Sequence, residues 1–237
     1  MGAFTRVENL IGQESLKKLS TSSVAVFGVG GVGSFVVEAL VRSGIGKIAI
    51  FDGDVVDETN LNRQLIATKN TIGMDKVEAV KKRLTDINEN LDITTQKIFY
   101  LKENADQIDL SKFDYVVDAV DTVSAKLELI LRAKEKGVPI ISCMGTGGKL
   151  QMESLKVADI YQTSGCPLAR VMRRELKKHR VNKLKVVYST EVVKSSQTND
   201  KKADGKTAPP SIIFVPATAG LYIAREVVLD LIKTKER

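Results

Sequence analysis

Short apolar runs alternate with longer amphipathic stretches between residues 24 and 142. The amphipathic stretches predict helices near 34–43, 75–88 and 123–136. The apolar runs predict strands at Val24–Phe27, Lys47–Asp52, Ile93–Tyr100, Tyr115–Asp118 and Val138–Ser142. Strands that alternate with helices in this way predict a parallel sheet with right-handed crossovers.

The pattern changes beyond Gly145-Thr146-Gly147-Gly148. Residues 149–158 and 184–190 are expected to form strands that pair antiparallel, and residues 167–180 and 217–233 are expected to form helices. At the other end of the chain, residues 5–20 look helical. We therefore expect a single α/β domain over residues 1–237, with a mostly parallel sheet flanked by helices and extended by antiparallel strands in the C-terminal part.

A glycine-rich turn, residues 28–33, joins the first expected strand to the helix that follows it. Gly28 permits a tight turn, Gly30 lets a phosphate approach backbone N–H groups, and Gly33 lets the helix pack on the strand, with Gly31 in the same cradle. Asp52 comes about 20 residues later and would accept from a ribose hydroxyl. This Rossmann-like pattern makes residues 1–142 the nucleotide-binding part, and it leaves NAD, FAD and ATP open.

Polar residues beyond Asp52 favour ATP. Arg63 can fork onto phosphate oxygens, Asn60 and Gln64 can hydrogen-bond the same phosphate tail, and Lys76 adds a compact positive charge. A triphosphate requires such neutralisation, whereas a nicotinamide does not. An NAD-dependent dehydrogenase is therefore a distant alternative.

The apolar run over residues 115–121 ends in a carboxylate, Asp121. Ligands of open α/β sheets bind at the carboxyl edge of the strands, where this residue is expected. An exposed acid beside a triphosphate suits Mg²⁺, which keeps several waters and takes few protein ligands. The alternatives are a helix N-cap for Asp121 and a surface salt bridge for Arg63.

These motifs resemble the ATP-dependent adenylating enzymes related to ubiquitin activation, the ThiF, MoeB and HesA group. The resemblance covers nearly all of the chain and runs through residues 4–6, 28–33, 52–54, 60–64, 73–77 and 118–121. It implies that the ribose is held by Asp52, the phosphates by Asn60, Arg63 and Lys76, and Mg²⁺ by Asp121, with Asp54 and Gln64 in the same site. It also implies a homodimer in which Arg6 reaches the partner's triphosphate. An arginine supplied by a second chain in this way can raise the rate of phosphate transfer roughly a thousandfold.

Residues 166–176 and 211–221 resemble one branch of that group. Members of this branch use ATP to activate the threonyl carboxylate of threonylcarbamoyladenosine in tRNA, through an acyl adenylate as in a ligase, so that a ring closes with loss of water. The resemblance implies the same dehydratase activity here. The candidates for tRNA contact lie on the 167–180 helix, and they are Arg170, Arg173, Arg174, Lys177 and Lys178. Charged helix faces are otherwise often only solvated.

The chain has only two cysteines, Cys143 and Cys166. Relatives that adenylate sulfur-carrier proteins usually carry two Cys-x-x-Cys pairs for a structural zinc, and four thiolates cannot be assembled from two. Adenylation of the Gly-Gly terminus of such a carrier is therefore the second alternative, and a non-catalytic nucleotide-dependent scaffold is the third. We expect Cys143 in the core and Cys166 as a small packed residue rather than a reactive thiol.

The formal net charge of +7 and the pI near 9.3 favour an anionic partner such as tRNA. No apolar run approaches twenty residues and no signal pattern opens the chain, so we expect a cytoplasmic protein without a membrane partner. Residues 193–210 are polar and are expected to form a mobile loop in the C-terminal part, residues 143–237, either a lid over tRNA or a surface insertion. A monovalent cation, K⁺ or Na⁺, and a sulfur-transfer partner from a cysteine desulfurase system both stay open.

Overall fold

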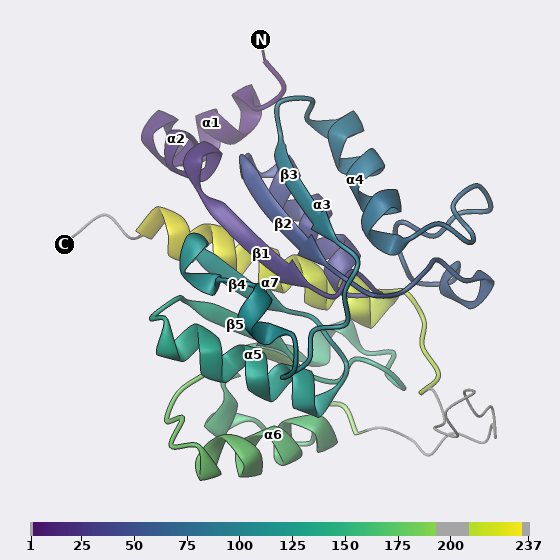
Figure 1. Ribbon diagram of the computed structural model, residues 1–237, viewed down its shortest axis with the longest axis vertical. Coiled ribbons are helices and arrows are strands. Elements are labelled where there is room, and N and C mark those ends of the chain that lie inside the picture. Colours follow the sequence, from purple (N-terminus) through teal and green to yellow (C-terminus); the bar gives the residue numbers. More distant parts are fainter. Residues whose placement is uncertain (1, 193–208, 234–237) are drawn as a thin grey trace.

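The computed structural model describes residues 2–192 and 209–233, and one seven-stranded sheet runs through it (Figure 1). The strands are β1 (Ser23–Phe27), β2 (Lys47–Phe51), β3 (Asp92–Gln96), β4 (Tyr115–Asp118), β5 (Ile140–Cys143), β6 (Leu155–Asp159) and β7 (Lys185–Ser189). Their order is β3-β2-β1-β4-β5-β7-β6, and only β6 and β7 pair antiparallel. The expected fold, a mostly parallel Rossmann-like sheet with antiparallel pairing in its C-terminal part, is confirmed.

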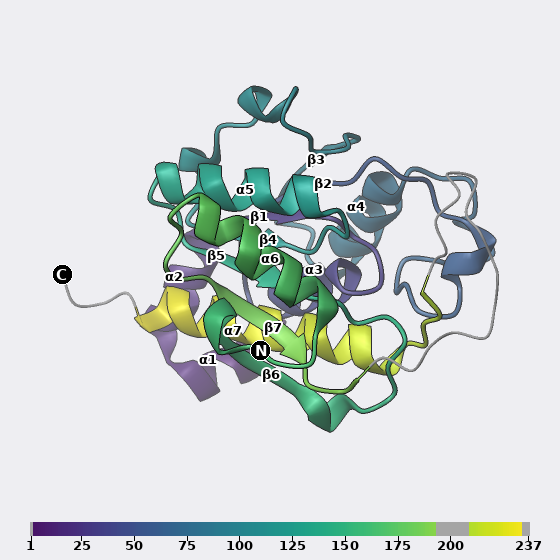
Figure 2. The same ribbon diagram turned by 90° about the horizontal axis from the view of Figure 1, so that it is seen from below.

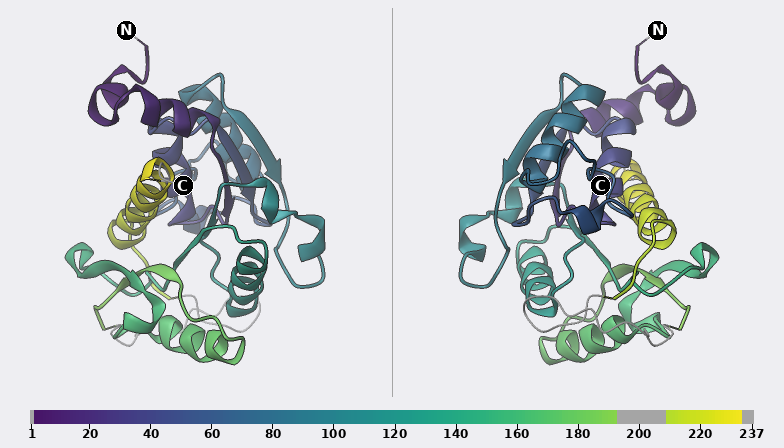
Figure 3. Two further views of the ribbon diagram at one scale, coloured as in Figure 1. Left: turned by 90° about the vertical axis from the view of Figure 1, so that its left-hand side faces the viewer. Right: turned by 90° about the vertical axis from the view of Figure 1, so that its right-hand side faces the viewer.

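Helices cover both faces of the sheet (Figures 2 and 3). One face carries α3 (Gly33–Arg42), α4 (Lys76–Ile87) and α7 (Phe214–Lys233), and the other carries α5 (Val123–Glu135) and α6 (Pro167–Lys178). Side chains of β1 alternate between the two sides, as the period of a strand requires. Val24 and Val26 pack in the core beneath α3 and α7, whereas Ala25 and Phe27 pack in the core beneath α5 and α6. None of the helices among the described residues is both long and apolar enough to span a membrane.

The amino-terminal segment differs from its expected form. Residues 5–20 were expected to be helical, and the structure divides this stretch into two helices, α1 (Thr5–Ile11) and α2 (Gln13–Thr21), separated at Gly12. The backbone of Gly12 has φ +85° and ψ +156°, a conformation that is open almost only to glycine and that ends a right-handed helix.

Several element boundaries also differ. The strand expected to reach Tyr100 ends at Gln96, where its pairing with β2 stops. The strand expected from Lys149 begins only at Leu155, after the short 3₁₀ helix η4 (Met152–Ser154). The last helix begins at Phe214 rather than Ala217, because a proline is tolerated in the first turn of a helix. Most of the loop predicted over 193–210 lies outside the described residues.

Candidate functional site

The glycine turn between β1 and α3 leaves no room for side chains at two of its positions. Gly28 has φ +85°, and a Cβ there would lie 2.7 Å from the carbonyl oxygen of Ala119, in the loop after β4. A Cβ on Gly33 would lie 1.8 Å from the carbonyl oxygen of Gly28. The turn is therefore folded tightly against the β4–α5 loop, and the N-terminus of α3 opens at the carboxyl edge of the sheet, as the sequence predicted.

Asp52 follows β2 and holds this turn from the other side. Its carboxylate accepts hydrogen bonds from the N–H of Val29 at 2.7 Å and from the N–H of Asp54 at 2.9 Å. Burial raises the pKa of the Asp52 carboxyl above its ordinary value, while Lys76 and the two backbone donors act in the opposite direction. Each carboxylate oxygen keeps a second acceptor position, which is available to a ribose hydroxyl.

Lys76 begins α4 with its side chain only 6% exposed, and its ammonium nitrogen lies 2.7 Å from the carboxylate of Asp54. The backbone N–H of Lys76 also donates to the carbonyl of Asp54 at 3.0 Å, so the two segments are joined twice. A phosphate that arrives at this ammonium group would share it with Asp54, whose own carboxylate is half exposed. Lys76 is thus held in place beside Asp52 before any ligand binds.

Arg63 and Gln64 lie across the glycine turn. Cδ of Arg63 lies 3.7 Å from the position of a Cβ on Gly31, and Nε2 of Gln64 lies 3.8 Å from that of a Cβ on Gly30. Nη1 of Arg63 donates to the carbonyl of Thr59 at 2.8 Å, which orients the guanidinium fork. The Oε1 atom of Gln64 is buried and lacks a hydrogen-bond partner among the described residues. A buried orphan atom beside a glycine turn is a position that a polar ligand can satisfy.

Asn60 is buried in the short 3₁₀ helix η1 (Glu58–Asn60). Its Oδ1 accepts from the N–H of Asp57 at 3.1 Å, while its Nδ2 reaches only Thr59 Oγ1, at 3.4 Å. The amide therefore keeps a donor available for phosphate. The structure brings most of the predicted nucleotide-site residues to the carboxyl edge, namely Gly28, Gly30, Gly31, Gly33, Asp52, Asp54, Asn60, Arg63, Gln64 and Lys76.

Asp121 lies exposed in the β4–α5 loop, two residues after Ala119, whose carbonyl approaches the glycine turn. It is not the N-cap of α5, since Thr122 occupies that position without a side-chain cap bond. Within residues 2–192 and 209–233, no three His, Cys, Asp or Glu side chains are grouped so that they could hold an ion by themselves. The donor set therefore fits only an ion that brings most of its own ligands, as Mg²⁺ does with phosphate oxygens and water.

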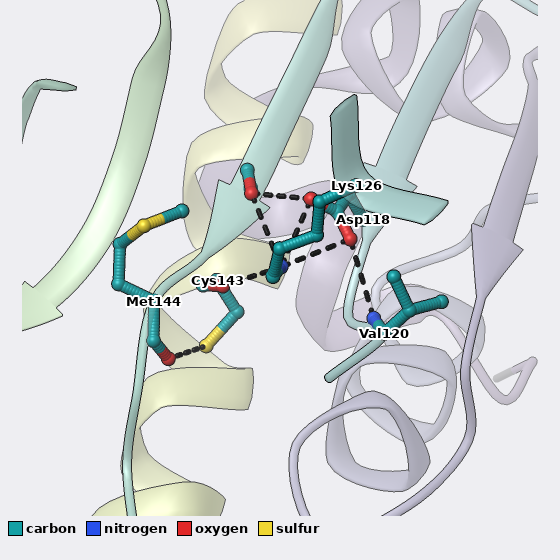
Figure 4. A network of polar contacts seen from close by, with 6 residues as sticks. Asp118, Val120, Lys126, Cys143 and Met144 are labelled. Atoms are coloured by element: carbon teal, nitrogen blue, oxygen red, sulfur yellow. Dashed lines mark hydrogen bonds and ion pairs between the residues drawn. The ribbon is translucent and has the colours of Figure 1, made fainter. Parts of the chain in front are cut away.

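A buried ion pair behind this loop was not predicted from the sequence. Lys126 in α5 and Asp118 at the end of β4 are both 0% exposed, and Nζ lies 3.0 Å from each carboxylate oxygen (Figure 4). A signal was present in the sequence, because Lys126 shares a helical stripe with the buried Leu129, Ile130 and Ala133. A lysine on the apolar stripe of a helix requires a buried partner.

Arg6 does not reach this site within one chain. It is exposed on α1, and α1 and α2 lie at the end of the sheet where β1 begins (Figure 1). The side chains of Phe4 and Leu16 approach Gly44, in the turn that precedes β2. Any contact of Arg6 with a triphosphate therefore requires a second chain.

The five basic residues predicted on α6 differ in their surroundings. Arg173 is half-buried and donates through Nη1 to the carbonyl of Thr163 at 2.9 Å, so it supports the turn before the helix. Arg174 and Lys178 both pair with Glu175. Arg170 and Lys177 are exposed and form no ion pair with a described residue. These last two are the basic groups of α6 most available to a phosphate backbone.

Both cysteines are free thiols and buried. Burial raises the pKa of the Cys143 thiol to about 12, which keeps it protonated at neutral pH. Cys166 is 3% exposed at the N-cap position of α6, so the expectation of a packed residue is confirmed. Neither thiol is exposed to a substrate.

Residues 209–216 border the candidate site, a contact that the sequence did not predict. Nδ2 of Asn62 donates to the carbonyl of Ser211 at 2.8 Å, and Cβ of Pro216 lies 3.4 Å from the position of a Cβ on Gly31. The C-terminal part of the chain therefore forms one wall beside the glycine turn.

The model of the ThiF family matches residues 4–236, which is almost the entire chain. The chain belongs to the ThiF family. Among similar ThiF-family proteins is the tRNA threonylcarbamoyladenosine dehydratase of Bacillus subtilis, which is 42% identical over 243 residues, covering 98% of this chain and 96% of the relative. The dehydratase of Escherichia coli is 34% identical over 204 residues, covering 83% and 76% of the two chains.

Solved structures of ThiF-family proteins agree with this relation. The E. coli tRNA N6-threonylcarbamoyladenosine dehydratase in complex with AMP superposes with a TM-score of 0.89 at 29% identity, over 98% of this chain and 94% of the other. Its complex with ATP gives a TM-score of 0.86 at the same identity and coverage. The E. coli protein therefore has this fold and binds both nucleotides.

Proposed function

We propose that the protein is an ATP-dependent tRNA threonylcarbamoyladenosine dehydratase. It activates the threonyl carboxylate on a tRNA adenosine, and the activated group closes a ring with net loss of water. The observation that carries this proposal is the set of hydrogen-bond donors around the glycine turn, above all the Arg63 guanidinium beside Gly31 and the Gln64 Nε2 amide beside Gly30. The similarity to the B. subtilis dehydratase over 98% of the chain supports the choice of substrate.

In this proposal ATP binds at the carboxyl edge of the sheet, where polar side chains surround the glycine turn. The ribose hydroxyls donate to Asp52, and the phosphates lie over the glycine turn at the N-terminus of α3, whose N–H groups favour anions. Asn60, Arg63 and Lys76 donate to the same phosphates. Arg63 is the residue best able to hold two phosphate oxygens at once, because its guanidinium is a planar fork.

The reaction begins when a threonyl carboxylate oxygen attacks the α-phosphorus of ATP and pyrophosphate leaves. The product is an acyl adenylate, in which the carboxyl carbon carries AMP as a leaving group. The tethered carbamoyl group then attacks that carbon, the ring closes and AMP departs. Tethering gives large effective molarities, so the second step needs no enzyme thiol, which is consistent with two buried cysteines.

Asp121 is the residue that would hold Mg²⁺ beside the triphosphate, either directly or through water. The ion would supply positive charge that stabilises the leaving pyrophosphate. Arg6 of a second chain would add a further cation, so a homodimer belongs to the same proposal. The substrate is a tRNA, and we infer a cytoplasmic location from that substrate.

Mass spectrometry tests the proposal directly. Incubation with ATP, Mg²⁺ and total tRNA should convert threonylcarbamoyladenosine to a nucleoside lighter by one water, and omission of ATP should prevent it.

Arg63→Ala should lower the rate of this conversion by two orders of magnitude or more, since losing one well-aimed donor costs about 3 kcal/mol in the barrier. Binding of tRNA should remain. Arg225→Ala, a matched change of an exposed arginine on α7, should leave the rate intact; full activity of Arg63→Ala would contradict the assignment.

A further inference from the structure

We propose that Asp118 and Lys126 are positioning residues, a buried pair that fixes the β4–α5 loop and thereby sets both Asp121 and the glycine turn for the nucleotide. The inference rests on the proposed ATP-dependent function. It concerns two side chains that touch neither the ribose nor the phosphate positions described above, and it is carried by their contacts (Figure 4).

The two side chains are fully satisfied by each other and by the ends of two strands. Nζ of Lys126 lies 3.0 Å from both carboxylate oxygens of Asp118, 2.7 Å from the carbonyl oxygen of Cys143 and 3.3 Å from Oγ of Ser142. The Ser142 hydroxyl donates to Asp118 Oδ2, and the N–H of Val120 donates to Asp118 Oδ1 at 3.2 Å. Both side chains are 0% exposed, so the network is closed to solvent.

Asp118 is the last residue of β4, and Lys126 reaches it from α5. Asp118 is paired in register with Phe27 of β1 and with Ser142 of β5. Lys126 comes from α5 and reaches across to the carbonyl of Cys143, the last residue of β5. One ammonium group therefore ties α5 to the carboxyl ends of β4 and β5, the edge at which the candidate site lies.

The backbone between this pair and the glycine turn has little freedom. The N–H of Ala119 donates to the carbonyl of Phe27 at 2.9 Å, and the Ala119 carbonyl oxygen lies only 2.7 Å from the position of a Cβ on Gly28. Val120 is held by Asp118 on the other side. Residues 119–120 are thus packed between the pair and the turn, and Asp121 follows directly. A shift of this loop would move Asp121 and the turn together.

Stability alone does not account for such a pair. A buried ion pair can often be replaced by apolar side chains of similar volume without loss of stability, because desolvation offsets most of the attraction between the charges. What apolar residues cannot reproduce is the set of hydrogen bonds to Val120 N–H and Cys143 carbonyl, which fix one loop position.

The double variant Asp118→Leu/Lys126→Met tests the proposal, because it removes both charges and leaves no single charge buried. The control is Lys185→Met, which breaks an ion pair with Glu226 and Asp230 at the start of β7, on the opposite edge of the same sheet. Two quantities are compared with the unmodified protein: amide hydrogen exchange of residues 119–122 without ligand, and the Mg²⁺ concentration that gives half-maximal ATP–pyrophosphate exchange.

We expect amide hydrogen exchange of residues 119–122 to accelerate about tenfold or more in the double variant, because local opening of the loop becomes easier. The Mg²⁺ requirement should rise about tenfold as Asp121 loses its fixed position. Lys185→Met should change neither quantity. The proposal would be overturned if the double variant showed unchanged amide hydrogen exchange at residues 119–122 and an unchanged Mg²⁺ requirement, even if the melting temperature of the variant fell.

If the double variant does not fold, Ser142→Ala provides the second test. It removes the hydroxyl that contacts both partners and keeps the pair itself. A smaller shift of the same two quantities supports the proposal, and no shift overturns it. The hydrogen-exchange result needs no catalysis, so a failure of the proposed dehydratase activity in the unmodified protein would be recognised separately, by absent ATP–pyrophosphate exchange.

Discussion

At the scale of single residues, buried polar side chains define the candidate site more sharply than exposed ones. Asp52, Gln64 and Lys76 are each less than a tenth exposed although all three are polar or charged. Burying such groups is costly unless they find partners, so their presence at one edge of the sheet requires compensation from each other or from a ligand. Asp121 and Arg6 are exposed, so their burial sets no such requirement.

We expect nucleotide affinity to decrease as pH is lowered, because the Asp52 carboxylate becomes protonated and its pKa is raised. The ionised carboxylate accepts a ribose hydroxyl, and protonation removes that acceptor. Because burial raises this pKa, the loss should begin above the ordinary aspartate value of about 3.9. The sign for folding is opposite: because the pKa of Asp52 is raised in the folded state, its contribution to the free energy of unfolding increases as pH falls through that pKa towards the ordinary value.

Calorimetric titration with ATP between neutral and mildly acidic pH measures this effect. Asp52→Asn, which cannot ionise, corrects for the titration of the phosphates themselves and should bind more weakly at neutral pH. An affinity ratio between the two proteins that stays constant across the pH range would count against a role for the Asp52 carboxylate.

Gly28→Ala should be far more damaging than alanine at another glycine with the same φ. Gly73 also has φ +85°, but nothing lies within 4 Å of its added Cβ, so Gly73→Ala should cost only the left-handed strain of about 1–2 kcal/mol. The Cβ on Gly28 would meet Ala119 at 2.7 Å as well. Denaturant unfolding should give a clearly larger loss for Gly28→Ala, together with lost ATP binding; equal losses would show that the close approach has little effect.

At the scale of elements, the features predicted correctly from the sequence are those that depend on the spacing of residues close together in the chain. The alternation of strands and helices, the glycine turn and the distance to Asp52 are all set by neighbours in the chain, and the structure agrees with them. The break at Gly12 was not predicted, because a single glycine is tolerated inside a helix at a cost of about 1 kcal/mol. The Asp118–Lys126 pair was missed because it depends on which strand end α5 packs against.

The basic residues of α6 also could be located from the sequence, whereas their contacts could not. The helical pattern identified all five, but their partners, Thr163 and Glu175, depend on the fold of the preceding turn and on neighbours along the helix. A pattern of charges therefore predicts where a basic helix lies, whereas its free cations become apparent only in the structure.

We expect the double variant Arg170→Glu/Lys177→Glu to weaken tRNA binding about tenfold or more while leaving ATP binding unchanged. Neutralised phosphates release their counterions, so the dependence of the binding constant on salt should also become shallower, by roughly 0.9 for each phosphate that the variant no longer neutralises. Lys81→Glu/Lys82→Glu, which makes the same charge change on exposed residues of α4, serves as the control. Equal weakening by both variants would mean that overall charge, and not α6, governs the association.

At the scale of the whole molecule, one sheet joins the two parts of the chain. β7 pairs with β5, and residues 209–216 lie beside Asn62 and the glycine turn, so the C-terminal part borders the candidate site. α6 begins near Gly145, after the carboxyl end of β5, and ends before β7 begins. The 12 residues of α6 span about 18 Å from end to end.

The most direct test of an acyl adenylate uses tRNA whose threonyl carboxylate carries oxygen-18. If a carboxylate oxygen attacks the α-phosphorus and ring closure then expels AMP, mass spectrometry should find one labelled oxygen in the AMP released per cyclised nucleoside. Cyclisation that yields unlabelled AMP, or that proceeds without consuming ATP, would contradict the account.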